Sequence, residues 1–117
     1  MSKLRSIEAA VKGEPYRRRF EGRNFDGTVP GDCLPTDVIA ATMYLGEDAV
    51  EMIVPSVRWT SARSCRFLFR LSAEQTAGLK ARRTYEVIVH AARGGTSYSL
   101  AAFRLPVKAA VKVGVSA

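Results

Sequence analysis

The sequence predicts an all-β protein built as a β-sandwich of about seven strands. Runs of alternating apolar and polar residues recur along the chain, and turn residues separate them at intervals of about eight to twelve positions. The most informative stretch is 71–89, where one alternating run ends, a single helical turn follows, and a tyrosine leads into the next run. A short polar connector between two such runs is typical of consecutive sandwich strands joined across an edge.

The beginning of the chain predicts an arm, an edge strand and a loop. We expect residues 1–15 to form an N-terminal arm, in which residues 6–12 have the composition for a short helical segment capped by Ser6. Residues 16–20 alternate weakly and predict an edge strand whose arginines face solvent. Glycine and proline crowd residues 21–34, which indicates a loop.

The middle of the chain predicts a hairpin followed by a short strand. Residues 37–45 carry apolar side chains on both faces, which indicates a strand covered on both sides. A turn at 46–48 and a second strand at 49–54 complete the hairpin. Residues 57–60 form a short strand whose tryptophan, Trp59, we expect in the core.

The clearest strand is 65–71, and the helical turn follows it. Ser72 and Gln75 have the spacing of a capping box, so the turn is expected to begin at Ser72. Tyr85 opens the next strand, and we expect its buried hydroxyl to bond the backbone upstream, as in a tyrosine corner. Along 65–71, alternation directs Cys65, Phe67, Phe69 and Leu71 to one face and Arg66, Leu68 and Arg70 to the other.

Two long strands close the fold. Residues 84–92 and 97–105 flank a Gly-Gly hairpin turn, and Pro106 ends the last strand or marks a sheet edge. We expect residues 109–117 to form a C-terminal arm. The order of the strands predicts an immunoglobulin-like β-sandwich over residues 16–108.

The charge of the chain is segregated along its length. The 117 residues, enough for one domain, carry a net charge of +7. Residues 1–23 carry a net +4, residues 24–57 hold six acids and no Lys or Arg, and residues 58–117 carry a net +9. Such segregation favours complementary contacts between copies or neighbours, and basic charge of this size also suits nucleic acid. The alternative is a surface whose charges serve solubility.

The compartment and the state of the cysteines follow from the same sequence. No apolar run approaches the roughly 20 residues of a membrane span, and no apolar signal-peptide core is present. We therefore expect the protein to stay, or to assemble, in a cytoplasm. Cys33 and Cys65, with His90 as the one histidine, do not match a zinc site. In a reducing compartment we expect two unpaired thiols, one or both buried; a disulfide across the sandwich is the alternative.

No residue pattern points to catalysis. His90 has no Ser or Cys nucleophile in a recognisable motif. Asp26, Asp32 and Asp37 share a glycine-rich loop, but their spacing does not match a calcium-binding EF-hand loop. The Gly-Gly pair precedes a strand, so it is a turn and not a phosphate-binding loop. We therefore expect no enzyme, no cofactor and no bound metal.

Two clusters of basic residues are candidates for contact with a partner. Tyr16 and Phe20 flank the first cluster, an arrangement that can hold single-stranded nucleic acid. The runs are short and no RNA-binding signature is present, so protection of an edge strand or a contact between subunits is favoured. The first cluster comprises Arg17, Arg18, Arg19 and Arg23, and the second comprises Lys80, Arg82, Arg83 and Arg93.

The order of these features resembles that of a known family. A double-sided strand ending in Gly-Glu-Asp (37–48) precedes the Trp59 strand, and Leu-Ser-Ala-Glu-Gln-Thr-Ala-Gly-Leu (71–79) is followed by Tyr-Glu-Val-Ile-Val (85–89). Over residues 16–108 the pattern is similar to the small immunoglobulin-like modules of tailed-phage virion proteins, such as baseplate, neck, tail and head-decoration components. The resemblance implies a structural, multi-copy role with no cofactor and no catalytic residues.

We therefore expect a non-enzymatic structural protein of a tailed-phage virion, assembled in the host cytoplasm. Its partners would be other virion proteins and copies of itself, contacted through the terminal arms, sheet edges and complementary charge. Deleting residues 1–15 or 109–117 should then leave the fold intact and abolish assembly. The alternative is a small basic nucleic-acid-binding β-module; neither function involves a membrane or a small-molecule substrate. The candidate interface residues are Arg17, Arg18, Arg19, Leu68, Ile88, Val111 and Val113.

Overall fold

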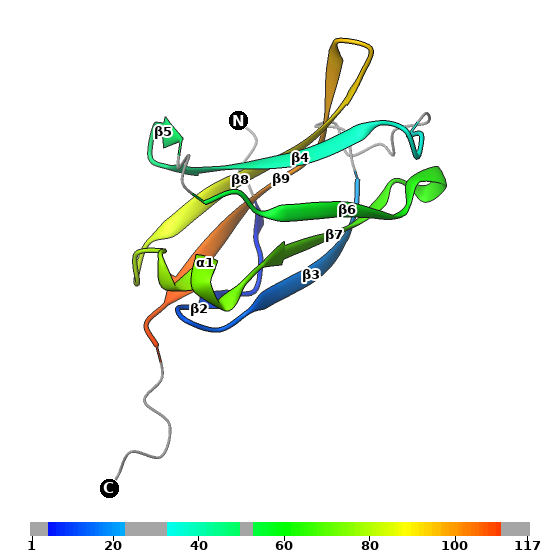
Figure 1. Cartoon of the computed structure of the whole chain (residues 1–117). Helices are drawn as coiled ribbons and strands as arrows, with labels where there is room; N and C mark the ends of the chain where they lie inside the picture. The colour runs from blue at the N-terminus through cyan, green and yellow to red at the C-terminus, as the bar shows by residue number, and fades with distance from the viewer. Residues whose placement is uncertain (1–4, 23–32, 50–52, 111–117) are drawn as a thin grey trace, which may run out of the picture.

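Two β-sheets packed face to face form the protein (Figure 1), as the sequence predicts. The computed structural model describes residues 5–22, 33–49 and 53–110. Within these residues, no helix is long and apolar enough to cross a bilayer. The elements are β1 (Arg5–Ser6), β2 (Ala10–Val11), β3 (Tyr16–Glu21), β4 (Val38–Leu45), β5 (Asp48–Ala49), β6 (Ser56–Ser61), the 3₁₀ turn η1 (Ala62–Ser64), β7 (Arg66–Leu71), α1 (Ala73–Ala77), β8 (Thr84–Arg93) and β9 (Thr96–Lys108).

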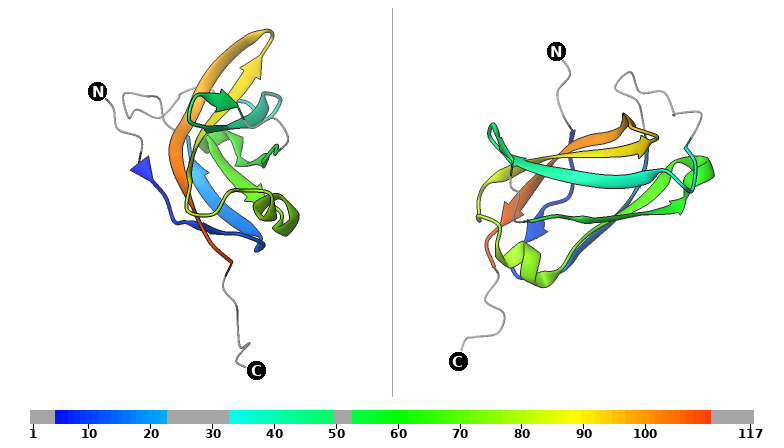
Figure 2. Two further views of the ribbon diagram at one scale, coloured as in Figure 1. Left: turned by 90° about the vertical axis from the view of Figure 1, so that its left-hand side faces the viewer. Right: turned by 45° about the horizontal axis from the view of Figure 1, so that its top comes forward.

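The strand order is that of an immunoglobulin-like sandwich. One sheet has the order β1-β9-β8-β4-β5, with β2 also pairing β9, and the other has the order β3-β7-β6. The pairs are antiparallel except that β1 and β2 run parallel to β9. The chain crosses repeatedly between the sheets: β1, β2, β4, β5, β8 and β9 lie in one and β3, β6 and β7 in the other, as in Greek-key sandwiches. The two views of Figure 2 show the layers and the position of α1 at one end.

The core lies between the sheets and is rich in aromatic rings. Phe20 stacks on Phe67 at 5.5 Å and on Phe103 at 4.7 Å between ring centroids. Phe69 meets Phe103 edge-on at 5.5 Å. The predicted inward face of β7 is confirmed, because Phe67, Phe69 and Leu71 are all buried in this cluster. Truncating one of these phenylalanines to alanine would cost about 3–5 kcal/mol.

The N-terminal segment is not the arm that we expected. In place of helical turns, residues 5–11 lie along the edge of β9, with Arg5 opposite Phe103 and Ala10 opposite Val107. Ala10 is fully buried. A helix this short is marginal in water, whereas the edge of β9 offers backbone partners and a place to bury apolar side chains. Deleting residues 1–15 is therefore no longer expected to leave the fold intact.

Pro106 does not end the last strand, which continues to Lys108. The amide of Val107 donates to the carbonyl of Arg83 at 2.9 Å, on the β8 side. Successive amides of a strand point to opposite sides. The N–H that Pro106 lacks would therefore have pointed towards β1 and β2. Those two strands separate at this point, since Ser6 pairs with Arg104 and the next paired residue is Ala10.

The corner between β7 and β8 is formed as predicted. Ser72 Oγ accepts from the Gln75 amide at 3.0 Å, and Gln75 Oε1 accepts from the Ser72 amide at 2.8 Å, which is a capping box. The Tyr85 hydroxyl is bonded upstream, accepting from the Lys80 amide at 2.9 Å. Thr76 Oγ1 joins this corner to the N-terminal segment by donating to the Glu14 carbonyl at 2.7 Å.

The cysteines are bridged, which corrects the expectation of two unpaired thiols. Cys33 and Cys65 form a disulfide with their Cα atoms 5.6 Å apart. Cys65 follows η1 in a left-handed conformation (φ 53°), and this turn directs its side chain to the segment that enters β4. The bridge closes a loop between residues 32 positions apart. The expectation of free thiols rests on a reducing compartment, where disulfides are rare, and the bridge does not follow that rule.

Candidate interaction surfaces

The outer face of the β3-β7-β6 sheet is a surface of arginines. The register places Arg17 opposite Arg70, Arg19 opposite Leu68, and Glu21 opposite Arg66. On the other side of β7, Leu68 faces Arg58. The described part of this face holds one acid, Glu21. We call it the arginine face; its arginines, all exposed, are Arg17, Arg19, Arg58, Arg66 and Arg70.

Leu68 lies in the middle of the arginine face but is not an exposed contact residue. It is 1% exposed and lies outside the core cluster between the sheets. Its neighbours across the strands are Arg19 and Arg58, and the aliphatic stems of arginines readily cover apolar groups. The expectation of an unpaired apolar residue at Leu68 is therefore wrong, and the described part of the face exposes charged and hydroxyl side chains.

Arg18 does not belong to the arginine face. Its Nη1 lies 3.8 Å from Glu8 Oε2, and its guanidinium lies 5.8 Å from the centre of the Phe20 ring. The alternation of β3 thus separates the predicted trio, with Arg17 and Arg19 on the outer surface and Arg18 on the side of the N-terminal segment.

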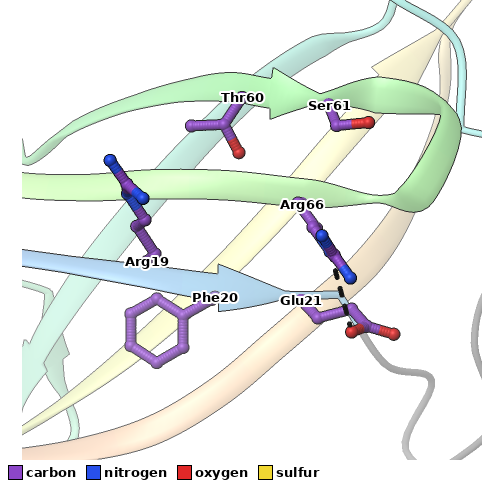
Figure 3. Close-up of a pocket in the computed structure, with 6 residues that line it drawn as sticks. All are labelled: Arg19, Phe20, Glu21, Thr60, Ser61 and Arg66. Carbon is purple, nitrogen blue, oxygen red and sulfur yellow. Dashed lines mark ion pairs between the residues drawn. The ribbon is translucent and has the colours of Figure 1, made fainter.

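An open hollow of about 560 Å³ lies at one end of the arginine face (Figure 3). A bulge in β6 near Thr60 places two hydroxyl residues against Arg66, since Trp59 faces Phe67 and Ser61 faces Arg66. Arg66 Nε lies 4.0 Å from Glu21 Oε2, a loose ion pair in which both side chains are solvent-accessible. The hollow is lined by Arg19, Phe20, Glu21, Thr60, Ser61 and Arg66.

The outer face of the other sheet has a different character. Ile88 lies at its centre, half-buried, between Thr42 of β4 and Ala102 of β9. Next to Ile88 along β8, Glu86 faces Arg104 of β9. We call this the Ile88 face. The expectation that Ile88 points outward agrees with this position.

Among the acids of the described residues, Asp37 has the most strongly shifted pKa, and its contacts serve the fold. Arg93 Nη2 donates to Asp37 Oδ2 at 2.8 Å, and the Tyr98 hydroxyl donates to the same oxygen at 2.6 Å. These hydrogen bonds, that of Arg93 foremost, hold the pKa of the Asp37 carboxyl far below its usual range. Burial, assisted by the hydrogen bond to Asp37, raises the pKa of Tyr98 to about 12. Trp59 Nε1 donates to the Asp37 carbonyl at 3.0 Å.

These contacts bear on two groups of residues that the sequence singled out, the second basic cluster and the three aspartates. Arg93 is bound to Asp37 and does not join Lys80, Arg82 and Arg83, which lie in the connection between α1 and β8. Asp37 is neutralised by an arginine, and its presumed co-ligands Asp26 and Asp32 lie outside the described residues. Across residues 5–22, 33–49 and 53–110, no three metal-ligating side chains gather.

The remaining interface candidates, Val111 and Val113, also lie outside the described residues. Sequence reasoning missed Arg58 as a member of a surface, and it did not join Arg66 and Arg70 to Arg17 and Arg19. The outward direction of each is visible from alternation, but the pairing that places them side by side is not. Comparison with known proteins adds no relative, because no protein-family model and no curated protein matches the chain.

Proposed function

We propose that this chain is a non-enzymatic structural protein of a tailed-phage virion that assembles with copies of itself and with other virion proteins. The proposal is supported by the sequence pattern that resembles phage immunoglobulin-like modules, together with the β-sandwich fold that this pattern predicts. The proposal of self-assembly rests on the Ile88 face, where a half-buried isoleucine lies between the small side chains of Thr42 and Ala102.

A second copy is the occupant that this face suits. In a two-fold contact each residue meets its partner reciprocally, so a surface that carries both members of a charge pair can complement itself. Glu86 and Arg104 are such a pair, adjacent on β8 and β9 beside Ile88. Two faces turned towards each other could bury Ile88 centrally and exchange the Glu86 and Arg104 contacts at the rim.

Strand exchange by the N-terminal segment is not part of this proposal, since residues 5–11 already pair with β9 of their own chain. The C-terminal arm, residues 109–117, remains a candidate for contacts with other virion proteins. A position in the baseplate, neck, tail or head decoration is proposed on the resemblance alone.

Light scattering of the purified chain at low and high salt tests the self-assembly. We expect a dimer or larger species that Ile88→Asp converts to a monomer. Val54→Asp is the matched control, because Val54 is 65% exposed and lies outside the face. A wild-type monomer at high concentration, or equal masses for wild type and Ile88→Asp, would contradict the self-assembly. For the virion role, mass spectrometry of purified phage particles should find the chain in several copies; its presence in the lysate but not in particles would contradict it.

A further inference from the structure

The arginine face has a regular geometry. Its arginines form rows across the sheet: Arg17 with Arg70, then Arg19 and Arg58 on either side of Leu68, then Arg66. Successive rows are about 7 Å apart, because alternate residues of a strand point to the same side. The result is an array of guanidinium groups on one sheet face, each able to bind an anionic oxygen pair through two N–H donors.

The composition of this face favours phosphate over an acidic protein surface. Interfaces between proteins generally have an apolar centre, whereas interfaces with DNA are polar and strongly positive. Here the central apolar residue, Leu68, is 1% exposed, and the positions around it are arginine, serine and threonine, with the single acid Glu21 in the described part of the face. The face therefore offers charge and hydrogen-bond donors without an apolar centre.

The same face lacks the means to hold unstacked bases. Proteins that bind single strands stack the bases on exposed aromatic rings. Tyr16 is 8% exposed and donates its hydroxyl to the Glu8 carbonyl, while the Phe20 ring stacks on Phe67 and Phe103. Tyr16 is thus committed to packing, Phe20 lines the hollow but already stacks on two other rings, and the described part of the face has no other ring.

We propose that the arginine face binds the sugar-phosphate backbone of duplex nucleic acid, without reading its sequence. A phosphate occupies the hollow between Arg19 and Arg66, next to the hydroxyl residues Thr60 and Ser61. The remaining arginines contact phosphates along the same strand and across the groove. Glu21 opposes this binding, because its carboxylate lies beside Arg66. The proposal goes beyond the virion role and does not depend on it, since the Ile88 face lies on the other sheet.

Fluorescence anisotropy with a labelled duplex of about 20 base pairs, titrated at about 50 to 200 mM salt, tests the proposal. Each phosphate neutralised contributes about −0.9 to the slope of log K against log salt, so four or five contacts predict a slope of about −4. Arg19→Gln/Arg66→Gln should reduce affinity about tenfold or more and make the slope shallower by about 2. Circular dichroism and Tm must show that this variant is folded.

Arg82→Gln/Arg83→Gln is the matched control, because it removes the same charge from the α1–β8 connection. It should reduce affinity less than about threefold, since it acts only through the net charge. Glu21→Gln should increase affinity. Equal losses in the two double variants would show that binding follows net charge and would overturn the assignment to this face.

Three further ligands separate the classes of partner. Duplexes of unrelated sequence should bind equally, and a single strand of the same length should bind more weakly. If polyglutamate bound as tightly as the duplex at equal salt, the face would be a site for acidic protein, and the proposal would be wrong. Preference for the single strand, or absence of duplex binding at about 50 mM salt, would also overturn it.

Discussion

Asp37 and Arg93 form a two-point ion pair between residues 56 positions apart, with Nε 2.8 Å from Oδ1 and Nη2 2.8 Å from Oδ2. The carboxyl side chain is completely covered, while 45% of the arginine side chain remains accessible. Through this pair the start of β4 is fixed to the β8–β9 hairpin, and the Trp59 bond to the Asp37 carbonyl adds β6 from the opposite sheet. The two sheets are thus joined by polar contacts at this end.

The first prediction concerns acid stability. In the folded state the Asp37 carboxyl keeps its charge at pH values where the unfolded chain takes up a proton, because its folded pKa is lowered. The stabilisation is present above the unfolded pKa, so the free energy of unfolding should decrease as the pH falls below about 4. Urea unfolding between pH 7 and pH 2.5 measures this decrease.

Asp37→Asn isolates that contribution. We expect a Tm lower by roughly 10 °C or more at pH 7, because Arg93 loses its charged partner, and a weaker loss of stability in acid. Asp48→Asn, at the exposed start of β5, is the control and should change neither property. If Asp37→Asn had the acid profile of the wild type, the pair would not be the cause.

The second prediction is that Tyr98 ionises later than an ordinary tyrosine. Burial and the hydrogen bond to Asp37 raise its pKa to about 12, so the folded protein holds this proton while an unfolded chain loses it near pH 10. The free energy of unfolding should therefore fall between about pH 10 and 12. Subtracting the ultraviolet absorbance titration of Tyr98→Phe from that of the wild type gives the Tyr98 curve. A midpoint near pH 10 in this curve would refute the prediction.

The third prediction concerns the disulfide. Closing a loop between residues 32 positions apart should stabilise the fold by roughly 3–4 kcal/mol through restriction of the unfolded chain. Reducing agent, or the double variant Cys33→Ser/Cys65→Ser, should lower the urea midpoint accordingly, and reducing agent should have no effect on the double variant. Thiol titration of the denatured, unreduced chain should find no free thiol, and finding two would exclude the bridge.

The fourth prediction concerns the N-terminal segment. Deleting residues 1–12 removes β1, β2 and the buried Ala10, and it uncovers the edge of β9. We expect a large decrease in Tm and faster hydrogen exchange at β9 amides that face this edge. Deleting residues 109–117, beyond β9, is the control and should leave both unchanged. An unchanged Tm after the N-terminal deletion would restore the view of this segment as a free arm.

Local sequence signals predicted the parts of the fold that depend on neighbouring residues. The capping box at Ser72, the bond from Tyr85 and the inward phenylalanines of β7 all follow from spacing or alternation within a few positions. The pairing of residues 5–11 with β9 could not be predicted in this way, because β9 lies about a hundred positions away in the chain.

The candidate surfaces depend on pairing even more strongly. Arg17 and Arg70 are neighbours only because β3 pairs with β7 in one particular register, and a shift by one residue would turn every side chain to the other face. The burial of Leu68 needs the same information, since its covering arginines come from two other strands. Sequence alternation gives the direction of each side chain but not its neighbours.

The parallel pairing at the edge of β9 has a mechanical consequence. The chain enters β1 opposite Phe103 and leaves β9 opposite Val11, so tension applied at these two points acts along the strands and in opposing directions. The backbone bonds of β1 and β2 to β9 would then be loaded together, in shear, and would have to break as a group. A hairpin pulled open from one end loses its bonds one after another under much smaller force. The edge that completes the sheet is therefore also the element on which resistance to stretching depends.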